Sequence, residues 1–317
     1  MIDRPLLTVA IPTCNGARFV AEAVRSILSQ EHICIDFNIH DDRSEDDTVA
    51  VVRSIAGDRV RVEVNSERLG LAGNWNRCVE ASRTPFVAVF HQDDVMLPGH
   101  LQSHDAAIRD HPDLGFVCGA SEVIDENGAD VPPSVVGREQ IESVDRVYGP
   151  GAFLAELTAF NPLRCSAVTV SKSAHAEVGG FDPSYRYVVD WDFWLRVARR
   201  HSVAWLAAPT VAIRWHSSSE THRFKTGTAD LEESIRLLNS LNDDPEIDAK
   251  SSRSTADRRL ARAFLNRAYD AARRGDRALM TAALKRGVGL DRGILRHVVA
   301  DPRLAARLAV CWLFRRA

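Results

Sequence analysis

The sequence lacks the marks of several protein classes. No apolar run approaches the ~18 residues that a membrane-spanning helix needs, and the first residues do not resemble a signal peptide. None of the six cysteines forms a C-x-x-C pair, so neither a structural zinc site nor a redox motif is indicated. The 40 basic residues do not outnumber the 43 acidic ones, whereas a nucleic-acid-binding protein usually has a strongly basic face. We therefore expect a cytoplasmic protein with reduced cysteines and no nucleic-acid partner.

Glycine-rich loops that bind phosphate groups are also missing. The first apolar run leads into residues 11–16 (IPTCNG), which lack the glycines of the G-x-G-x-x-G motif, and there is no P-loop. These absences argue against a Rossmann oxidoreductase. A sugar-phosphate nucleotidyltransferase would need a Gly-rich basic loop at the same place, where this sequence has only Gly16 and Arg18. This enzyme class is kept as an alternative.

The sequence does contain an alternation of strand-like and helix-like segments. With 317 residues, 45% of them hydrophobic, the chain can form about two domains. Apolar runs are found at 6–11, 33–39, 60–64, 86–90 and 114–124, and amphipathic stretches between them at 17–30, 46–56, 74–82 and 98–110. This alternation predicts an α/β fold with a mainly parallel sheet and helices on both faces.

After about residue 224 only helical patterns remain, at 231–241, 258–274, 276–287 and 303–315. We therefore predict a catalytic domain over 1–224 and a helical C-terminal extension over 225–317.

Acidic pairs follow two of the expected strands. Asp41 and Asp42 come directly after the second strand, and Asp93 and Asp94 come after the fourth. Ligands bind at the carboxyl ends of strands in an open α/β sheet, where the two pairs would repel each other without a cation or a hydrogen-bond donor between them. Mg²⁺ or Mn²⁺ is typically held by one or two carboxylates together with substrate phosphates, which suits so sparse a site. Each pair alone also fits a helix cap or a polar turn.

A second group of polar residues lies downstream. Asp190 and Asp192 stand near the start of an expected helix, two residues apart, and so cannot share one helix face. We expect only one of them to act as a general base, and the alternative for Asp190 is a cap favoured by the helix dipole. His216 follows the expected strand 211–215, where a neutral imidazole offers a metal ligand or simply lies at the surface.

The order and spacing of these motifs resemble a family-2 glycosyltransferase of the GT-A fold over about residues 5–224. The similar segments are 8–15 (TVAIPTCN), like the opening strand and nucleotide loop, 41–48, like the acidic-serine motif, 91–94 (HQDD), like the metal motif, and 179–182 (GGFD), like the acceptor-side loop. The departures from the family pattern are Cys14 in place of an aromatic residue, Arg43 in place of glycine and Trp75 in place of arginine.

The resemblance implies an inverting enzyme that moves a sugar from a nucleotide-diphosphate donor (UDP, GDP or dTDP) to a hydroxyl of a glycan or lipid-linked acceptor, with Mn²⁺ or Mg²⁺ as cofactor. It points to cell-surface polysaccharide or glycolipid biosynthesis. The alternative is a relative that has lost catalysis and serves in glycan assembly or carbohydrate binding. The implied site residues are Asp190 as catalytic base; Pro12, Thr13, Asn15, Asp42, Asp93 and Arg214 for the nucleotide; Asp94 and His216 for the metal; and Gly180, Trp191 and Asp192 on the acceptor side.

The C-terminal extension supports only general expectations. The pattern of residues 258–286 predicts a helical hairpin around Gly275 that packs against the catalytic domain or a partner chain. A homo-oligomer is therefore one of the alternatives. Residues 302–316 place Leu304, Leu308, Cys311 and Trp312 on one face beside arginines. This pattern fits peripheral contact with an anionic membrane surface or an ordinary packing helix.

Overall fold

The computed structural model describes residues 5–30, 34–132, 141–219, 224, 226–241, 249–291, 293–294 and 302–316. It divides into two compact units, Met1–Leu157 with Asn161–His216, and Thr158–Phe160 with Ser217–Ala317. The domain boundary at residue 224 stays a prediction. Within the described residues, no helix has both the length and the apolar character needed to cross a bilayer.

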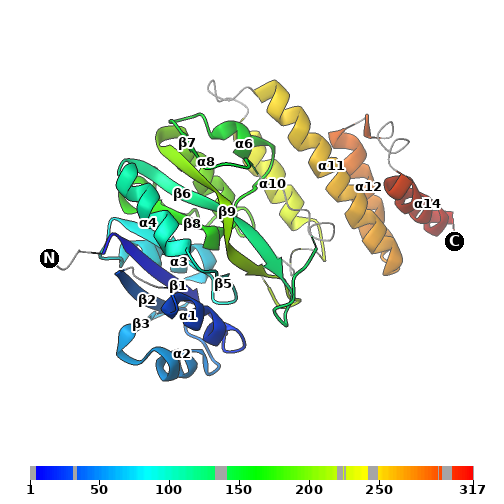
Figure 1. Cartoon of the computed structure of the whole chain (residues 1–317). Coiled ribbons are helices and arrows are strands. Elements are labelled where there is room, and N and C mark those ends of the chain that lie inside the picture. The colour runs from blue at the N-terminus through cyan, green and yellow to red at the C-terminus, as the bar shows by residue number, and fades with distance from the viewer. Residues whose placement is uncertain are drawn as a thin grey trace. The chain divides into compact units, whose positions relative to one another are not determined.

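The first half of the larger unit alternates strands and helices as the sequence predicts (Figure 1). Its strands are β1 (Leu7–Thr13), β2 (Ile35–Asp41), β3 (Arg61–Val64) and β4 (Phe86–Val89). Its helices are α1 (Val20–Leu28), α2 (Thr48–Ala56) and α3 (Gly70–Glu80). The four strands pair in parallel in the order β3-β2-β1-β4, and the buried side chains of β1 and β2 form much of the core.

The second half extends the same sheet with strands of both directions. The strands are β5 (Val95–Met96), β6 (Leu114–Ile124), β7 (Arg146–Tyr148), β8 (Val168–Ser171) and β9 (Ser202–Arg214). The helices are α4 (His100–Asp110), α6 (Leu154–Ala159), α7 (Lys172–Val178) and α8 (Val189–Arg200). Strand β8 runs antiparallel between β4 and β6, while β6 pairs in parallel with β9. This arrangement brings the ends of β4 and β9 to the loop that contains the second acidic pair.

Several elements differ in extent from the sequence pattern. The expected strand 211–215 is the last part of β9, which begins at Ser202. Pro209, which is exposed, interrupts the apolar pattern and so hides this continuity in the sequence. Pro209 lies where the pairing with β6 changes register, so its missing N–H costs no sheet hydrogen bond. Helix α3 begins at Gly70 rather than at residue 74, because side-chain oxygens outside the helix satisfy its first N–H groups.

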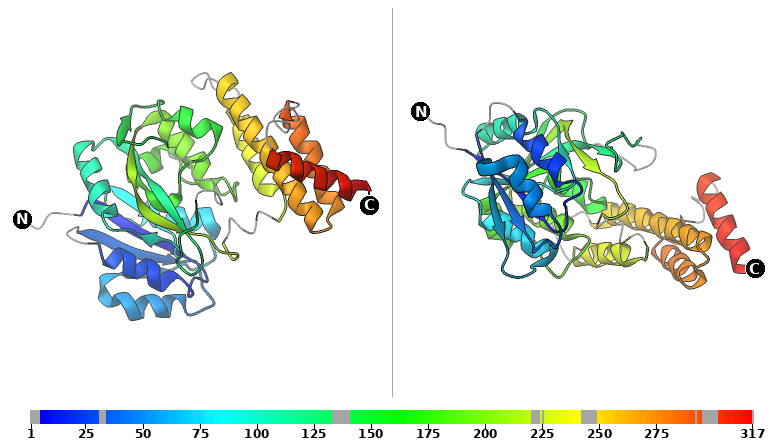
Figure 2. Two further views of the ribbon diagram at one scale, coloured as in Figure 1. Left: turned by 45° about the vertical axis from the view of Figure 1, so that its right-hand side comes forward. Right: turned by 90° about the horizontal axis from the view of Figure 1, so that it is seen from below.

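The smaller unit is helical. Its helices are α10 (Ala229–Ser240), α11 (Ala249–Arg273), α12 (Arg277–Leu290) and α14 (Pro302–Arg316). Helices α11 and α12 lie side by side in both views of Figure 2, and they are joined at Gly275, which has φ +80°, and capped by Asp276. This confirms the predicted hairpin.

The last helix shows only part of its expected apolar face. Leu308 packs against the small core of the helical unit, and Cys311 is buried. The side chains of Leu304 and Trp312 lie outside the described residues. The membrane contact expected for residues 302–316 therefore stays a prediction.

Candidate active site

The first acidic pair lies where β1 and β2 end side by side. Asp41 accepts a hydrogen bond from the Thr13 hydroxyl (2.7 Å) and two more from the backbone N–H and hydroxyl of Ser44. Asp42 is buried, and its carboxylate accepts the N–H groups of Leu69 (2.7 Å) and Gly70 (2.9 Å) at the start of α3. Hydrogen-bond donors of the protein therefore balance both carboxylates, and Asp42 anchors α3 rather than capping the helix that follows it in sequence.

Asn15 joins the two loops that follow β1 and β2. Its side-chain oxygen accepts the N–H of Glu45 (2.7 Å), and its own N–H donates to the Ser44 hydroxyl (2.8 Å). The Asn15 backbone takes the left-handed conformation (φ 50°), which asparagine tolerates better than most residues. Pro12 lies half-buried in β1, opposite His40 of β2. Their expected role in binding the nucleotide stays a prediction.

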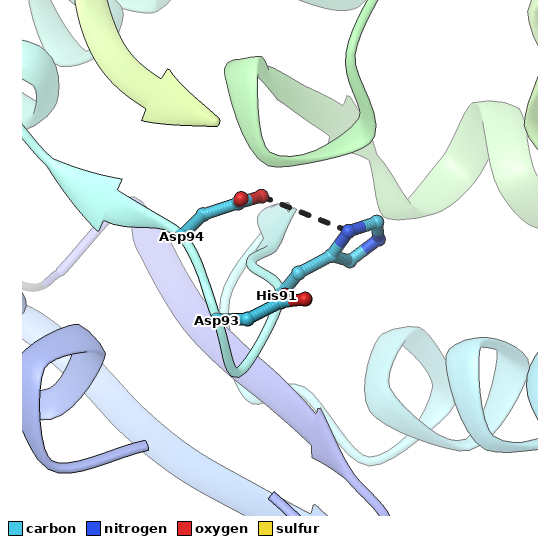
Figure 3. Close-up of side chains that lie close together, drawn as sticks. All are labelled: His91, Asp93 and Asp94. Carbon is cyan, nitrogen blue, oxygen red and sulfur yellow. Dashed lines mark ion pairs between the residues drawn. The ribbon is translucent and has the colours of Figure 1, made fainter. Parts of the chain in front are cut away.

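The second acidic pair belongs to a cluster in the loop after β4. One ligand atom from each of His91, Asp93 and Asp94 lies within 4.8 Å of the others, and the imidazole of His91 approaches the Asp94 carboxylate to 3.7 Å (Figure 3). Asp94 is only 2% exposed, and it accepts hydrogen bonds from the Ser166 hydroxyl and from the backbone N–H of Arg214. Burial and the neighbouring charge of Asp93 raise the pKa of Asp94 to about 8.

The donor set of this cluster fits a divalent cation. Two carboxylates and one imidazole suit Mn²⁺ or Mg²⁺, and each Asp94 oxygen keeps a lone pair beyond the bond it accepts. Burial lowers the pKa of His91, which keeps the imidazole neutral, as a metal ligand must be. The Nε2 atom of His91 is buried with no hydrogen-bond partner among the described residues. His91 adds to the predicted site, and its only signal in the sequence is its place beside the acidic pair.

His216 and Arg214 hold this loop from the end of β9. The Nε2 atom of His216 lies 2.8 Å from the Asp93 carboxylate, so His216 touches the cluster through Asp93. The Arg214 guanidinium is 1% exposed and donates to the carbonyl oxygens of Asp93 and Asp125 and to the carboxylate of Glu22 (2.6 Å). In this conformation the Arg214 guanidinium contacts protein groups and does not face a site for the diphosphate, which is the role that the resemblance implies.

Asp190 stands in the first turn of α8, near the same cluster. It accepts a hydrogen bond from the Asn161 side chain (3.2 Å), and burial raises its pKa. The charge of Asp190 raises the pKa of His91 against the larger lowering effect of burial. Burial raises the pKa of the Cys165 thiol, and the charges of Asp190 and Asp94 add to this rise. The structure thus brings Asp190 toward the loop after β4.

Two of the three residues expected on the acceptor side, Gly180 and Asp192, belong to the contacts of the loop that precedes α8, and Trp191 contacts α6. Asp192 pairs with Arg196 (2.7 Å), which also donates to the carbonyl oxygens of Val178 and Gly180. Gly180 has φ +73°, and a Cβ there would lie 2.7 Å from the Asn76 side-chain oxygen. Trp191 is buried and donates its Nε1–H to the carbonyl oxygen of Leu157 (2.7 Å).

Residues 8–164 match the family described as Glycosyl transferase family 2. The chain belongs to glycosyltransferase family 2. An uncharacterized protein of Mycobacterium tuberculosis is 30% identical over 268 residues, 80% of each chain. An uncharacterized glycosyltransferase of Rickettsia prowazekii is 26% identical over 226 residues, 70% of this chain and 67% of that protein.

Solved structures identify the fold of this glycosyltransferase. The structure of S. aureus TarS 1-349 in complex with UDP-GlcNAc aligns with a TM-score of 0.63 at 14% identity, covering 91% of this chain and 90% of that one. The same TarS fragment in complex with UDP aligns with a TM-score of 0.59. At this level of identity the likeness concerns the fold, and it confirms the expected GT-A architecture with a helical C-terminal region.

The position of Asp42 predicts a structural cost for its removal. Asp42→Ala would remove two part-buried hydrogen bonds from the N–H groups of Leu69 and Gly70 to a charged acceptor, so the free energy of unfolding should fall by about 1–3 kcal/mol. Urea denaturation of the purified variant measures this change. Exposed Asp47, whose side chain caps no helix, gives the control Asp47→Ala, expected within about 0.5 kcal/mol of the parent. Equal free energies of unfolding for the two variants would show that the Asp42 contacts do not stabilise the fold.

Proposed function

We propose that this family-2 glycosyltransferase moves a sugar from a nucleoside diphosphate donor to an acceptor hydroxyl, with inversion and with a divalent cation. The observation that carries the proposal is the cluster of His91, Asp93 and Asp94, with the half-buried Asp190 close enough for its charge to act on His91. TarS, which shares the fold, was solved with UDP-GlcNAc and with UDP, which supports a nucleotide-sugar donor.

The names of two shorter matches support an acceptor class. A Campylobacter jejuni protein named as a GalNAc(5)-diNAcBac-PP-undecaprenol beta-1,3-glucosyltransferase is 31% identical over 102 residues. A succinoglycan biosynthesis protein of Rhizobium meliloti is 32% identical over 102 residues. We therefore propose a glycan or lipid-linked acceptor in surface polysaccharide assembly. Membrane contact through residues 302–316 stays a prediction, since Leu308 and Cys311 of the expected apolar face pack inside the helical unit.

The nucleoside is assigned to the ends of β1 and β2. Pro12, Thr13 and Asn15 line this end of the sheet, and Asp42 keeps one lone pair for a donor on the base beyond the three N–H groups it accepts. We assign Asp93, which directly precedes Asp94 in the loop after β4, to the ribose. Arg214 supports the site by positioning Asp93 and the start of α1 through Glu22.

The cation is assigned to the loop after β4. Asp94 would be its main ligand, His91 and Asp93 would complete the set from the protein, and His216 contacts Asp93. When bound, a divalent cation would supply positive charge that stabilises the negative charge developing on the diphosphate. Mn²⁺ or Mg²⁺ suits these ligands. The positive charge would stabilise the ionised carboxylate of Asp94, whose pKa is raised by burial.

Asp190 is assigned as the general base. Its carboxylate takes the proton of the acceptor hydroxyl while the hydroxyl oxygen bonds to the anomeric carbon and the bond from that carbon to the diphosphate oxygen breaks. One displacement inverts the anomeric carbon and needs no covalent enzyme intermediate. The hydrogen bond from Asn161 orients the Asp190 carboxylate.

The assignment of Asp190 predicts a selective loss of turnover. Asp190→Asn keeps the size of the side chain but removes the base, so kcat should fall about 10²–10⁴-fold while nucleotide affinity stays near that of the parent. Radiolabelled sugar transfer and calorimetric nucleotide titration measure the two quantities. Asp192→Asn, on the same helix turn but paired with Arg196, is the matched control and should retain far more turnover. Near-normal turnover of Asp190→Asn would overturn the assignment.

The raised pKa of Asp190 predicts the pH dependence of turnover. The base acts as a carboxylate, so kcat rises with pH through its pKa, and burial moves this rise to higher pH than an ordinary aspartate gives. A pH profile of kcat measured at saturating cation locates the acid limb. The limb should disappear from the residual activity of Asp190→Asn. A profile in which both proteins share one acid limb would assign that limb to another group.

Ligand-dependent stabilisation tests the donor and the cation together. A ligand that binds only the native state raises the melting temperature, so UDP, GDP or dTDP should do so when Mn²⁺ or Mg²⁺ is present and much less with EDTA. Differential scanning fluorimetry measures the shift. Asp94→Asn should lose the cation-dependent part. No shift with any of the three nucleotides would contradict the proposed donor class.

A further inference from the structure

The side chain of Gln92 joins the two loops that the proposed donor site uses. Its Oε1 accepts the backbone N–H of Cys14 (3.0 Å), and its Nε2 donates to the Cys14 carbonyl oxygen (3.1 Å). One amide group thus pairs with both backbone groups of a single residue 78 positions earlier in the chain. Two hydrogen bonds in opposite directions fix both the distance and the orientation between the loops.

Gly16 shows how closely Gln92 is seated. A Cβ at position 16 would overlap the side-chain carbonyl group of Gln92 and lie 3.0 Å from its Nε2. Gly16 is not among the glycines with positive φ, so its backbone conformation does not call for glycine, whereas the approach of Gln92 does. The loop is fixed on its other side, because the Gly16 N–H donates to Thr48 (2.8 Å).

The two partners of this contact belong to different ends of the proposed donor site. Cys14 follows Thr13 directly, and the charge of Asp42 reaches its thiol. Gln92 stands between His91 and Asp93, inside the loop assigned to the cation. A shift of either loop would change the spacing between the place of the base and the place of the diphosphate.

We propose that Gln92 is a positioning residue that sets the spacing between the nucleoside end and the cation end of the donor site. The inference rests on the proposed function. A ligand that reaches both ends gains affinity because its second contact forms at high effective concentration, and this gain depends on a fixed spacing. Gln92 therefore favours the intact nucleoside diphosphate with its cation far more than it favours either half alone.

The first test compares three ligands on the full-length chain. Gln92→Ala should weaken binding of UDP with Mn²⁺ about tenfold, because the second contact loses effective concentration when the spacing is no longer fixed, but weaken uridine alone and Mn²⁺ alone by about twofold or less. Titration calorimetry measures all three, with circular dichroism to verify folding. Equal losses for uridine and UDP with Mn²⁺, or no loss for any ligand, would overturn the proposal.

The second test is rescue between the two sides of the contact. Gly16→Ala alone should displace the Gln92 amide and reproduce the loss for UDP with Mn²⁺. In the Gln92→Ala background the new methyl group has room, so Gly16→Ala should add about twofold or less. Gly149→Ala, where an added Cβ meets nothing within 4 Å, is the matched control and should change no affinity. Losses that multiply in the double variant would overturn the proposal.

Failure of this inference is distinct from failure of the proposed function. If the parent chain binds none of UDP, GDP and dTDP with Mn²⁺ or Mg²⁺, the donor assignment itself is wrong, and the role of Gln92 is wrong with it. If GDP or dTDP binds instead, the same comparison uses that nucleotide and guanosine or thymidine. If a nucleotide binds and the Gln92 and Gly16 losses multiply, only the positioning role is wrong.

Discussion

The burial of Asp94 beside Asp93 is the constraint on which this edge of the sheet depends. A carboxylate that is 2% exposed and next to a second carboxylate resists ionisation, which is why its pKa is raised to about 8. The Ser166 hydroxyl and the Arg214 backbone N–H offset part of that cost. His91 adds a neutral imidazole, so the arrangement suits a cation that arrives with the substrate.

The first acidic pair, Asp41 and Asp42, is hydrogen-bonded by donors of the protein itself. Asp41 and Asp42 lie at the end of β2, which is two strands from β4 in the sheet, and hydroxyl and N–H donors from Thr13, Ser44 and the start of α3 bond to both carboxylates. One pair therefore stabilises the loops around the proposed nucleoside site, while the other retains capacity for a ligand. This difference favours residues 91–94 for the proposed cation. Asp42 is chiefly structural and keeps one lone pair for the proposed nucleoside.

The sequence predicts those parts of the molecule that depend on local pattern. Apolar periodicity identifies the alternating strands and helices, and the position of Asp42 and Asp94 after strands places them at one edge of the sheet. Contacts between distant loops have no such signal. The pairing of Arg214 with Glu22 spans 192 positions, and the hydrogen bonds of Gln92 with Cys14 depend on how two loops meet. The continuity of β9 is likewise hidden by Pro209.

The location of a bound cation tests whether residues 91–94 form the metal site. Crystals grown with Mn²⁺ and UDP allow anomalous diffraction at the manganese absorption edge, which locates the metal independently of the protein electron density. The account predicts one strong peak in contact with the carboxylate of Asp94, with the imidazole of His91 and phosphate oxygens of UDP around it. UDP bound at the ends of β1 and β2 with manganese elsewhere, or with no manganese at all, would contradict it.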